Sequence, residues 1–123
     1  MASPCKQKLI LIVDRNPHVR GYLKREMRDA GYRVELAGSC RDVVETINSS
    51  RHIDGIIIDP DLPDKGSGIL EGKLEKGPAP IPVIIHSLLK KSSQDFFFCP
   101  REIIVEKGGA SIERLKNVLT RLL

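Results

Sequence analysis

Short apolar runs alternate with segments whose apolar residues recur at helical spacing, and this alternation repeats five times along the chain. Uninterrupted apolar runs are typical of strands that are covered on both faces. Strands that alternate with helices predict a parallel α/β sheet. The five predicted strands are 9–13, 34–37, 55–59, 82–86 and 102–106.

Capping residues predict where the helices begin and end. Asn16 is a suitable N-cap, Pro17 suits the first helical position, and Gly31 is a stop signal. Ser39 can cap a second helix. Three further helices are predicted at 69–74, within 88–100 and from Ser111 onward.

The length of 123 residues fits one domain, predicted over 1–123 with a short tail at 1–7. No apolar stretch approaches the roughly 20 residues that cross a bilayer, and no signal-peptide core is present. Cys5, Cys40 and Cys99 are odd in number and widely spaced. They predict free thiols in a reducing compartment, and hence a cytoplasmic protein.

The net charge is +4, but basic and acidic residues are interleaved. The densest basic patch would lie on one helix, and a solvated helix surface explains it better than a phosphate-binding stripe. Nucleic acid is therefore not predicted as a direct partner. The patch consists of Arg20, Lys24, Arg25 and Arg28, with Glu26 and Asp29 among them.

Polar side chains stand where four of the predicted strands end: Asp14, Asp59, Ser87 and Lys107. Taken alone, Asp59 is equally well explained as a turn-forming residue that closes its strand. Together, however, these side chains lie along one edge of a parallel sheet, where ligands bind. A carboxylate there can attack a phosphoryl group, while an ammonium and a divalent cation neutralise charge and a hydroxyl binds the product.

The chain resembles the receiver domain of two-component response regulators over about residues 8–123. The resemblance rests on Leu-Ile-Val-Asp14, Gly31-Tyr32, the run from Asp54 to Pro63, the run from Ile81 to Ser87, and Ile-Ile-Val-Glu-Lys107. It implies a flavodoxin-like (βα)5 three-layer sandwich with a five-stranded parallel sheet in the order 2-1-3-4-5.

The resemblance also implies a function. Asp59 would accept a phosphoryl group from the phosphohistidine of a sensor histidine kinase or phosphotransfer protein, and a conformational change would carry the signal. Ser87 and Lys107 would sense and clamp the phosphate, and Asp14 would help to bind Mg²⁺ with Asp59. The resemblance implies a phosphoacceptor in a phosphorelay and not an enzyme, although such a chain can catalyse its own phosphotransfer and dephosphorylation.

The metal site departs from the family at Arg15, where the family has a second acid. An arginine supplies no oxygen for Mg²⁺. It either pairs with Asp59 and takes the place of the cation, or extends into solvent. Asp61 could supply the missing oxygen, although a turn-capping role is the alternative.

Other departures concern the surroundings of the site. Pro60 offers no N–H to a phosphoryl oxygen. Leu88 replaces a small residue and narrows the access, while Gly108 replaces a proline, so we expect a trans bond there. Ile104 stands where many receivers carry an aromatic residue, which argues against a ring-flip relay from Ser87.

Two functional hypotheses follow. The first is a phosphoaccepting receiver, and the second is a degenerate receiver that binds partners without phosphorylation, with Arg15 mimicking the cation. A small nucleotide-binding enzyme would need a glycine-rich loop after the first strand, and 15–18 is not one. For a downstream partner or output domain, we expect the surface formed by Phe96–Phe98 and the last helix; burial of the phenylalanines is the alternative.

Overall fold

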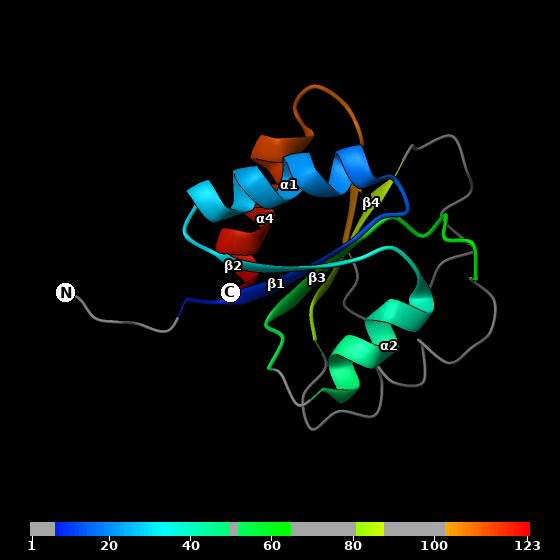
Figure 1. The fold of residues 1–123 in the computed structure, drawn as a ribbon. Coiled ribbons are helices and arrows are strands. Elements are labelled where there is room, and N and C mark those ends of the chain that lie inside the picture. Colours follow the sequence, from blue (N-terminus) through cyan, green and yellow to red (C-terminus); the bar gives the residue numbers. More distant parts are fainter. Residues whose placement is uncertain (1–6, 50–51, 65–80, 88–102) are drawn as a thin grey trace.

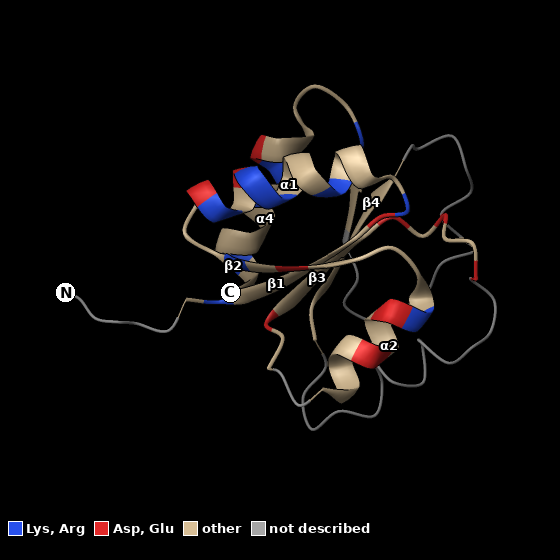
Figure 2. Ribbon diagram, viewed as in Figure 1, with Lys and Arg blue, Asp and Glu red and all other residues tan. Residues whose placement is uncertain are grey.

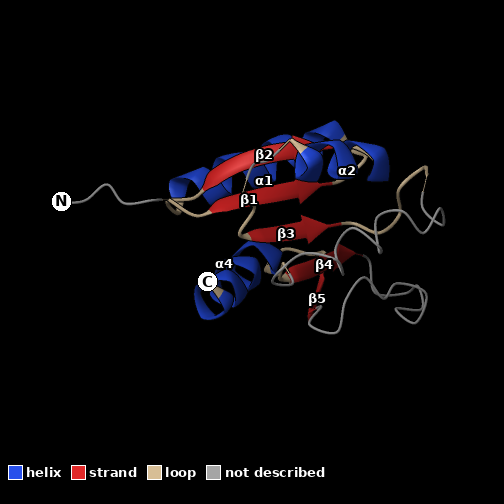
Figure 3. Cartoon of the chain, turned by 90° about the horizontal axis from the view of Figure 1, so that it is seen from below, coloured by secondary structure: helices blue, strands red, loops and turns tan. Residues whose placement is uncertain are grey.

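The computed structural model describes residues 7–49, 52–64, 81–87 and 103–123, which form a five-stranded sheet with helices packed on it. All strands run parallel in the order β2-β1-β3-β4-β5, which confirms the predicted α/β fold and strand order (Figure 3). In chain order the elements are β1 (Leu9–Val13), α1 (Pro17–Asp29), β2 (Arg33–Ala37), α2 (Cys40–Asn48), β3 (Gly55–Ile58), β4 (Val83–Ser87), β5 (Ile103–Glu106) and α4 (Ser111–Leu122).

The sheet is the middle of three layers, with α1 and α4 on one face and α2 on the other (Figure 1). Ile12 of β1 packs in one core with Leu23 of α1 and Leu115 of α4. The neighbouring Leu11 points to the opposite face and packs in a second core with Val43 of α2. Because successive strand residues point to opposite faces, β1 is buried along its whole length, as its apolar run predicts.

The helices α1 and α2 begin at the predicted caps. Asn16 Oδ1 accepts a backbone N–H of the first turn at 2.9 Å, and Pro17 is the first helical residue. Ser39 Oγ accepts the N–H of Asp42 at 3.1 Å. Gly31 follows α1 with a φ of 99°, a conformation that glycine adopts without steric cost.

Several element bounds differ by one residue from the prediction. β2 starts one residue earlier and β4 runs one residue further, to Ser87. β3 ends at Ile58, so Asp59 is the first residue beyond the strand and is free to turn into the site. Three predicted features lie outside the described residues: the helices at 69–74 and within 88–100, and Phe96–Phe98.

The predicted basic patch lies along α1 (Figure 2). Arg25 and Arg28 are exposed and Lys24 is half-buried, as expected of a solvated helix surface. Among the described residues, no helix is both long enough and apolar enough to span a membrane.

Candidate functional site

The ends of β1 and β3 place two carboxylates side by side. The strands are neighbours, with Val13 paired to Ile58, so the next residues, Asp14 and Asp59, leave the sheet together. The N–H of Asp59 donates to the carbonyl oxygen of Val13 at 2.8 Å, which extends the ladder by one bond. The N–H of Asp14 donates likewise to Ala37 of β2 at 3.1 Å. The backbone thus fixes both carboxylates at the carboxyl edge of the sheet.

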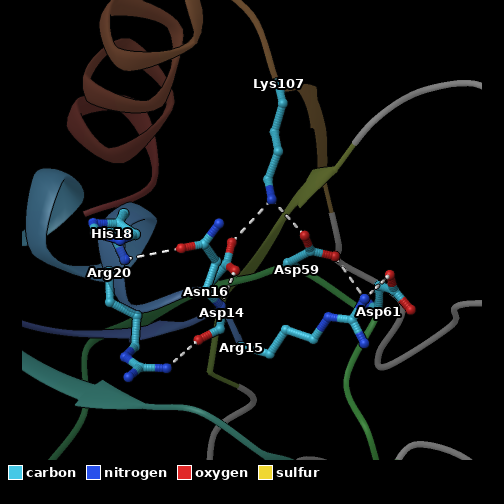
Figure 4. Close-up of polar contacts among 8 residues, drawn as sticks. All are labelled: Asp14, Arg15, Asn16, His18, Arg20, Asp59, Asp61 and Lys107. Atoms are coloured by element: carbon cyan, nitrogen blue, oxygen red, sulfur yellow. Dashed lines mark hydrogen bonds and ion pairs between the residues drawn. The ribbon is translucent and has the colours of Figure 1, made fainter.

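Lys107 joins the two carboxylates (Figure 4). Its Nζ donates to Oδ2 of Asp14 at 3.0 Å and to Oδ2 of Asp59 at 2.5 Å. The N–H of Lys107 donates to the carbonyl oxygen of Ser87 at 2.8 Å, one step beyond the last β4–β5 pair. Asp14, Asp59 and Lys107, which follow three strands, therefore meet at one edge with Ser87, the last residue of β4, and Lys107 contacts both carboxylates.

The two carboxylates favour an ammonium at Lys107 and outweigh the opposing effect of burial. Desolvation alone would lower its pKa, but the hydrogen bonds to Asp59 and Asp14, with the charges of both carboxylates, raise the pKa above its usual value. The side chain is only 21% exposed. Lys107 is therefore a fixed positive charge in the centre of the site.

Asp14 and Asp59 use all of their carboxylate oxygens. Besides Lys107, Asp14 Oδ1 accepts the N–H of Asn16 at 2.9 Å, and Asp59 Oδ1 accepts the N–H of Asp61 at 2.9 Å. The Asp14 side chain is 3% exposed, whereas that of Asp59 is 15% exposed. Asp59 is therefore the more accessible carboxylate of the two.

Arg15 lies at the exposed rim of the site and contacts Asp61. Its Nη2 is 3.5 Å from Oδ2 of Asp61, and the two side chains are 59% and 45% exposed (Figure 4). Among the ion pairs of the described residues, Asp59 pairs with Lys107 and not with Arg15. Lys107, not Arg15, thus occupies the position between the carboxylates.

Arg20 is a site residue that the sequence reasoning missed. Its Nη1 donates to the carbonyl oxygen of Asp14 at 2.7 Å from the first turns of α1. The backbone of Gly38 lies beside it, and a Cβ added there would be 2.8 Å from the same Nη1. The sequence showed Arg20 only as part of a basic helix surface and gave no signal for this contact.

Asp64 was also missed. Its carboxylate accepts the N–H groups of Cys40 at 2.8 Å and Arg41 at 3.0 Å, both in the first turn of α2. Burial opposes its ionisation, but these backbone donors outweigh burial and lower its pKa. These hydrogen bonds hold the loop that starts at Asp59 against the N-terminus of α2. An acidic residue in a loop is the sequence feature that could have predicted this contact, since helix N-termini attract carboxylates.

His86 lies in β4 directly before Ser87 and is 4% exposed. Neither ring nitrogen has a hydrogen-bond partner in the described part of the chain. Desolvation, and secondly the positive charge of Lys107, lower its pKa to about 4. His86 is therefore a neutral imidazole buried close to the charged site.

The other departures of the sequence are placed as follows. Pro60 is buried directly after Asp59. No peptide bond within the described ranges is cis, so the bond before Gly108 is trans, as expected. Ile104 is 39% exposed on β5. Leu88, which was expected to narrow the access, lies outside the described residues.

The resemblance to receiver domains implies a Mg²⁺ ion at this edge, held by Asp14, Asp59 and Asp61. In the part of the chain that the structure describes, no group of three His, Cys, Asp or Glu side chains could hold a metal ion. Of the predicted ligands, Asp14 and Asp59 contact Lys107, and the carboxylate of Asp61 contacts Arg15. The residues as arranged do not fit a divalent cation.

The parallel sheet in the order 2-1-3-4-5, covered by helices on both faces, places the chain among flavodoxin-like α/β proteins, and its carboxyl edge carries two acids and a lysine in contact. The family model of the response regulator receiver domain matches residues 10–99, and the chain belongs to this family.

Solved structures similar to this chain are receivers as well. The chemotaxis response regulator CheY4 of Vibrio cholerae has a TM-score of 0.74 and 20% sequence identity, covering 96% of this chain and 100% of that one. A putative response regulator from Chloroflexus aurantiacus has a TM-score of 0.74 and 25% identity, covering 94% and 100%. A CheY-like receiver domain from Methylobacillus flagellatus has a TM-score of 0.76 and 20% identity, covering 96% and 100%. The search of curated proteins found no matching relative.

Proposed function

We propose that Asp59 is the phosphoacceptor of this receiver and takes its phosphoryl group from a phosphohistidine of a histidine kinase or phosphotransfer protein. One observation carries the proposal: the accessible carboxylate of Asp59 contacts a fixed ammonium, Lys107, at the edge of the sheet. A carboxylate nucleophile and a neighbouring positive charge are two of the groups that phosphoryl transfer uses.

The proposed step forms one bond and breaks one. A carboxylate oxygen of Asp59 attacks phosphorus, the P–N bond of the donor breaks, and its electron pair leaves on the imidazole nitrogen, which takes up a proton. The product on the receiver is an acyl phosphate. Lys107 neutralises charge on the phosphoryl oxygens during transfer, and the hydroxyl of Ser87 binds one of them afterwards.

Signalling would start from the redistribution of the Lys107 contacts. In the unmodified protein Lys107 divides its donors between Asp14 and Asp59. A phosphoryl group on Asp59 adds negative charge and new acceptor oxygens at the same place, which draws the ammonium away from Asp14. Since Lys107 follows β5, this movement reaches the face formed by β5 and α4, where we place the downstream partner or output domain.

The test is phosphorylation by acetyl phosphate, followed by intact-mass measurement. We expect one added phosphoryl group in the wild-type protein and none in Asp59→Asn. Asp29→Asn, at the exposed end of α1, is the matched control and should react like the wild type. An adduct that persists in Asp59→Asn would rule out Asp59 as the acceptor.

A second candidate is a receiver that binds its partner without phosphorylation. The observation in its favour is the Arg15–Asp61 pair at the rim, which stands where the family has a metal-binding acid. Under this function, neither acetyl phosphate nor a phosphohistidine donor yields an adduct. Partner binding would then be the same for the wild type and Asp59→Asn.

A further inference from the structure

We infer that Lys107, assisted by Arg15, stands in for the divalent cation, so that the unmodified site excludes Mg²⁺. The consequence of this exclusion for signalling rests on the proposed function, because the same site would accept the phosphoryl group. The exclusion itself can be tested, however, on protein that has never been phosphorylated.

The ammonium of Lys107 already lies where the ion would bind. A cation that bridges two carboxylates must lie between their oxygens, and Lys107 Nζ is already bound there, to Oδ2 of Asp14 and Oδ2 of Asp59. The remaining oxygen of each carboxylate accepts a backbone N–H, from Asn16 and Asp61 respectively. An incoming ion would have to displace the ammonium and compete with both N–H donors.

Arg15 also reduces the negative charge of the site. Three carboxylates, Asp14, Asp59 and Asp61, face two cations, Arg15 and Lys107, which leaves one net negative charge. An acid at position 15 would leave three. Mg²⁺ binds through hard oxygen ligands and their negative charge, and both are reduced by the arginine.

Asp61 pairs with Arg15 and does not replace the missing ligand. Its carboxylate is the nearest possible substitute for the missing ligand, but it contacts Arg15 at the exposed rim. An exposed pair at 3.5 Å is weak, so Arg15 acts mainly through its charge and its lack of oxygen. Lys107 is far less exposed, at 21%, and is the principal replacement for the ion.

The experiment follows Mn²⁺ as a paramagnetic substitute for Mg²⁺ by the broadening of backbone amide signals near Asp14 and Asp59, with Mg²⁺ competition as the specificity check. In the wild type we expect no saturable broadening there. Arg15→Asp should show saturable broadening there, with an affinity for Mn²⁺ roughly ten- to a hundredfold above any residual affinity of the wild type. Arg33→Asp makes the same charge change at the opposite edge of the sheet, at the start of β2, and should behave like the wild type.

Lys107→Met provides a second variant, in which the bridging ammonium is absent and the ion can take its place. Folding of each variant is checked by circular dichroism. If Lys107→Met fails to fold, Arg15→Asp still provides the test, because Arg15 is exposed and its replacement should not prevent folding. Wild-type binding as tight as that of Arg15→Asp would overturn the inference. So would the absence of binding in both variants, since the cations would then not be what excludes the ion.

The outcomes separate this inference from the proposed function. A wild-type protein that binds Mg²⁺ and is phosphorylated on Asp59 contradicts only the exclusion of the ion. A wild-type protein that neither binds Mg²⁺ nor forms an adduct contradicts only the proposed phosphoacceptor role.

Discussion

At the scale of single residues, the most unusual group is His86, a buried imidazole without a hydrogen-bond partner in the described part of the chain. Its folded-state pKa of about 4 lies below the usual value of 6.5, because of burial first and Lys107 second. The unfolded chain therefore binds more protons than the folded one between these two values. Stability is fully present above about pH 6.5 and falls as the pH drops towards 4.

We therefore predict that acidification from about pH 7 to about pH 4.5 lowers the free energy of unfolding by roughly 2–3 kcal/mol through His86 alone. His86→Phe should remove this part of the pH dependence without loss of stability at neutral pH, since an apolar ring leaves no buried polar atom unpaired. Urea unfolding at both pH values measures the effect. His18→Phe, which replaces an exposed histidine, is the control. If the free energy of unfolding changed equally between the two pH values in both variants, the prediction would be contradicted.

A second residue-scale prediction concerns Gly38 and Arg20. Gly38→Ala brings a Cβ within 2.8 Å of Arg20 Nη1, so the guanidinium must leave the carbonyl oxygen of Asp14. Because a long side chain can move away, we expect a loss of about 1 kcal/mol, the typical net value of one hydrogen bond. In an Arg20→Met background, Gly38→Ala should leave the free energy of unfolding nearly unchanged. A double-mutant cycle by urea unfolding measures this coupling, and additive losses would show that the two residues do not interact.

At the scale of elements, the loop after β3 and the start of α2 act as a unit. Asp64 accepts two N–H groups of the first turn of α2, while Asp61 donates its N–H to Asp59 in the same loop. A change at Asp59 is thus only a few residues from a contact that holds a helix. The lowered pKa of Asp64 means that its contribution is present above the usual value of 3.8 and is lost as the pH falls through the lower folded-state value.

We predict that Asp64→Ala destabilises the protein by about 1 kcal/mol, as is typical for the loss of an N-terminal helix cap. Asp64→Asn keeps one acceptor oxygen and should cost less. Hydrogen exchange at the amides of Cys40 and Arg41 locates the effect, because protection there should fall in Asp64→Ala. Unchanged protection at both amides would mean that the loop does not hold the helix.

At the scale of the whole molecule, the sequence predicted what depends on periodicity and on strand polarity. Apolar runs specified the strands, and the shared edge of parallel strands placed Asp14, Asp59 and Lys107 together. The position of Arg15 depends on which acid its exposed side chain reaches, and sequence spacing does not determine this. The Asp64 contact crosses 24 positions of the chain, and its geometry depends on the path of a loop.

Lys107 also ties distant parts of the molecule together, because its partners lie 93 and 48 positions away in the chain. Its loss would leave the carboxylate of Asp14, 3% exposed, without a counter-charge. We therefore predict that Lys107→Met lowers the free energy of unfolding by roughly 3 kcal/mol, at the low end for a broken buried pair because the lysine is partly exposed.

Adding Asp14→Asn to Lys107→Met should recover part of that loss, because the amide no longer leaves a buried charge unpaired. Urea unfolding of the two single variants and the double variant measures the recovery. Lys116→Met is the control: Lys116 also bridges elements, pairing with Glu26 of α1 at 3.3 Å, but both side chains are more than a quarter exposed. Its loss should cost no more than about 1 kcal/mol. If Lys107→Met and Lys116→Met lowered the free energy of unfolding equally, the unpaired carboxylate of Asp14 could not be the cause of the loss. Lys107 would then contribute no more to stability than an exposed lysine.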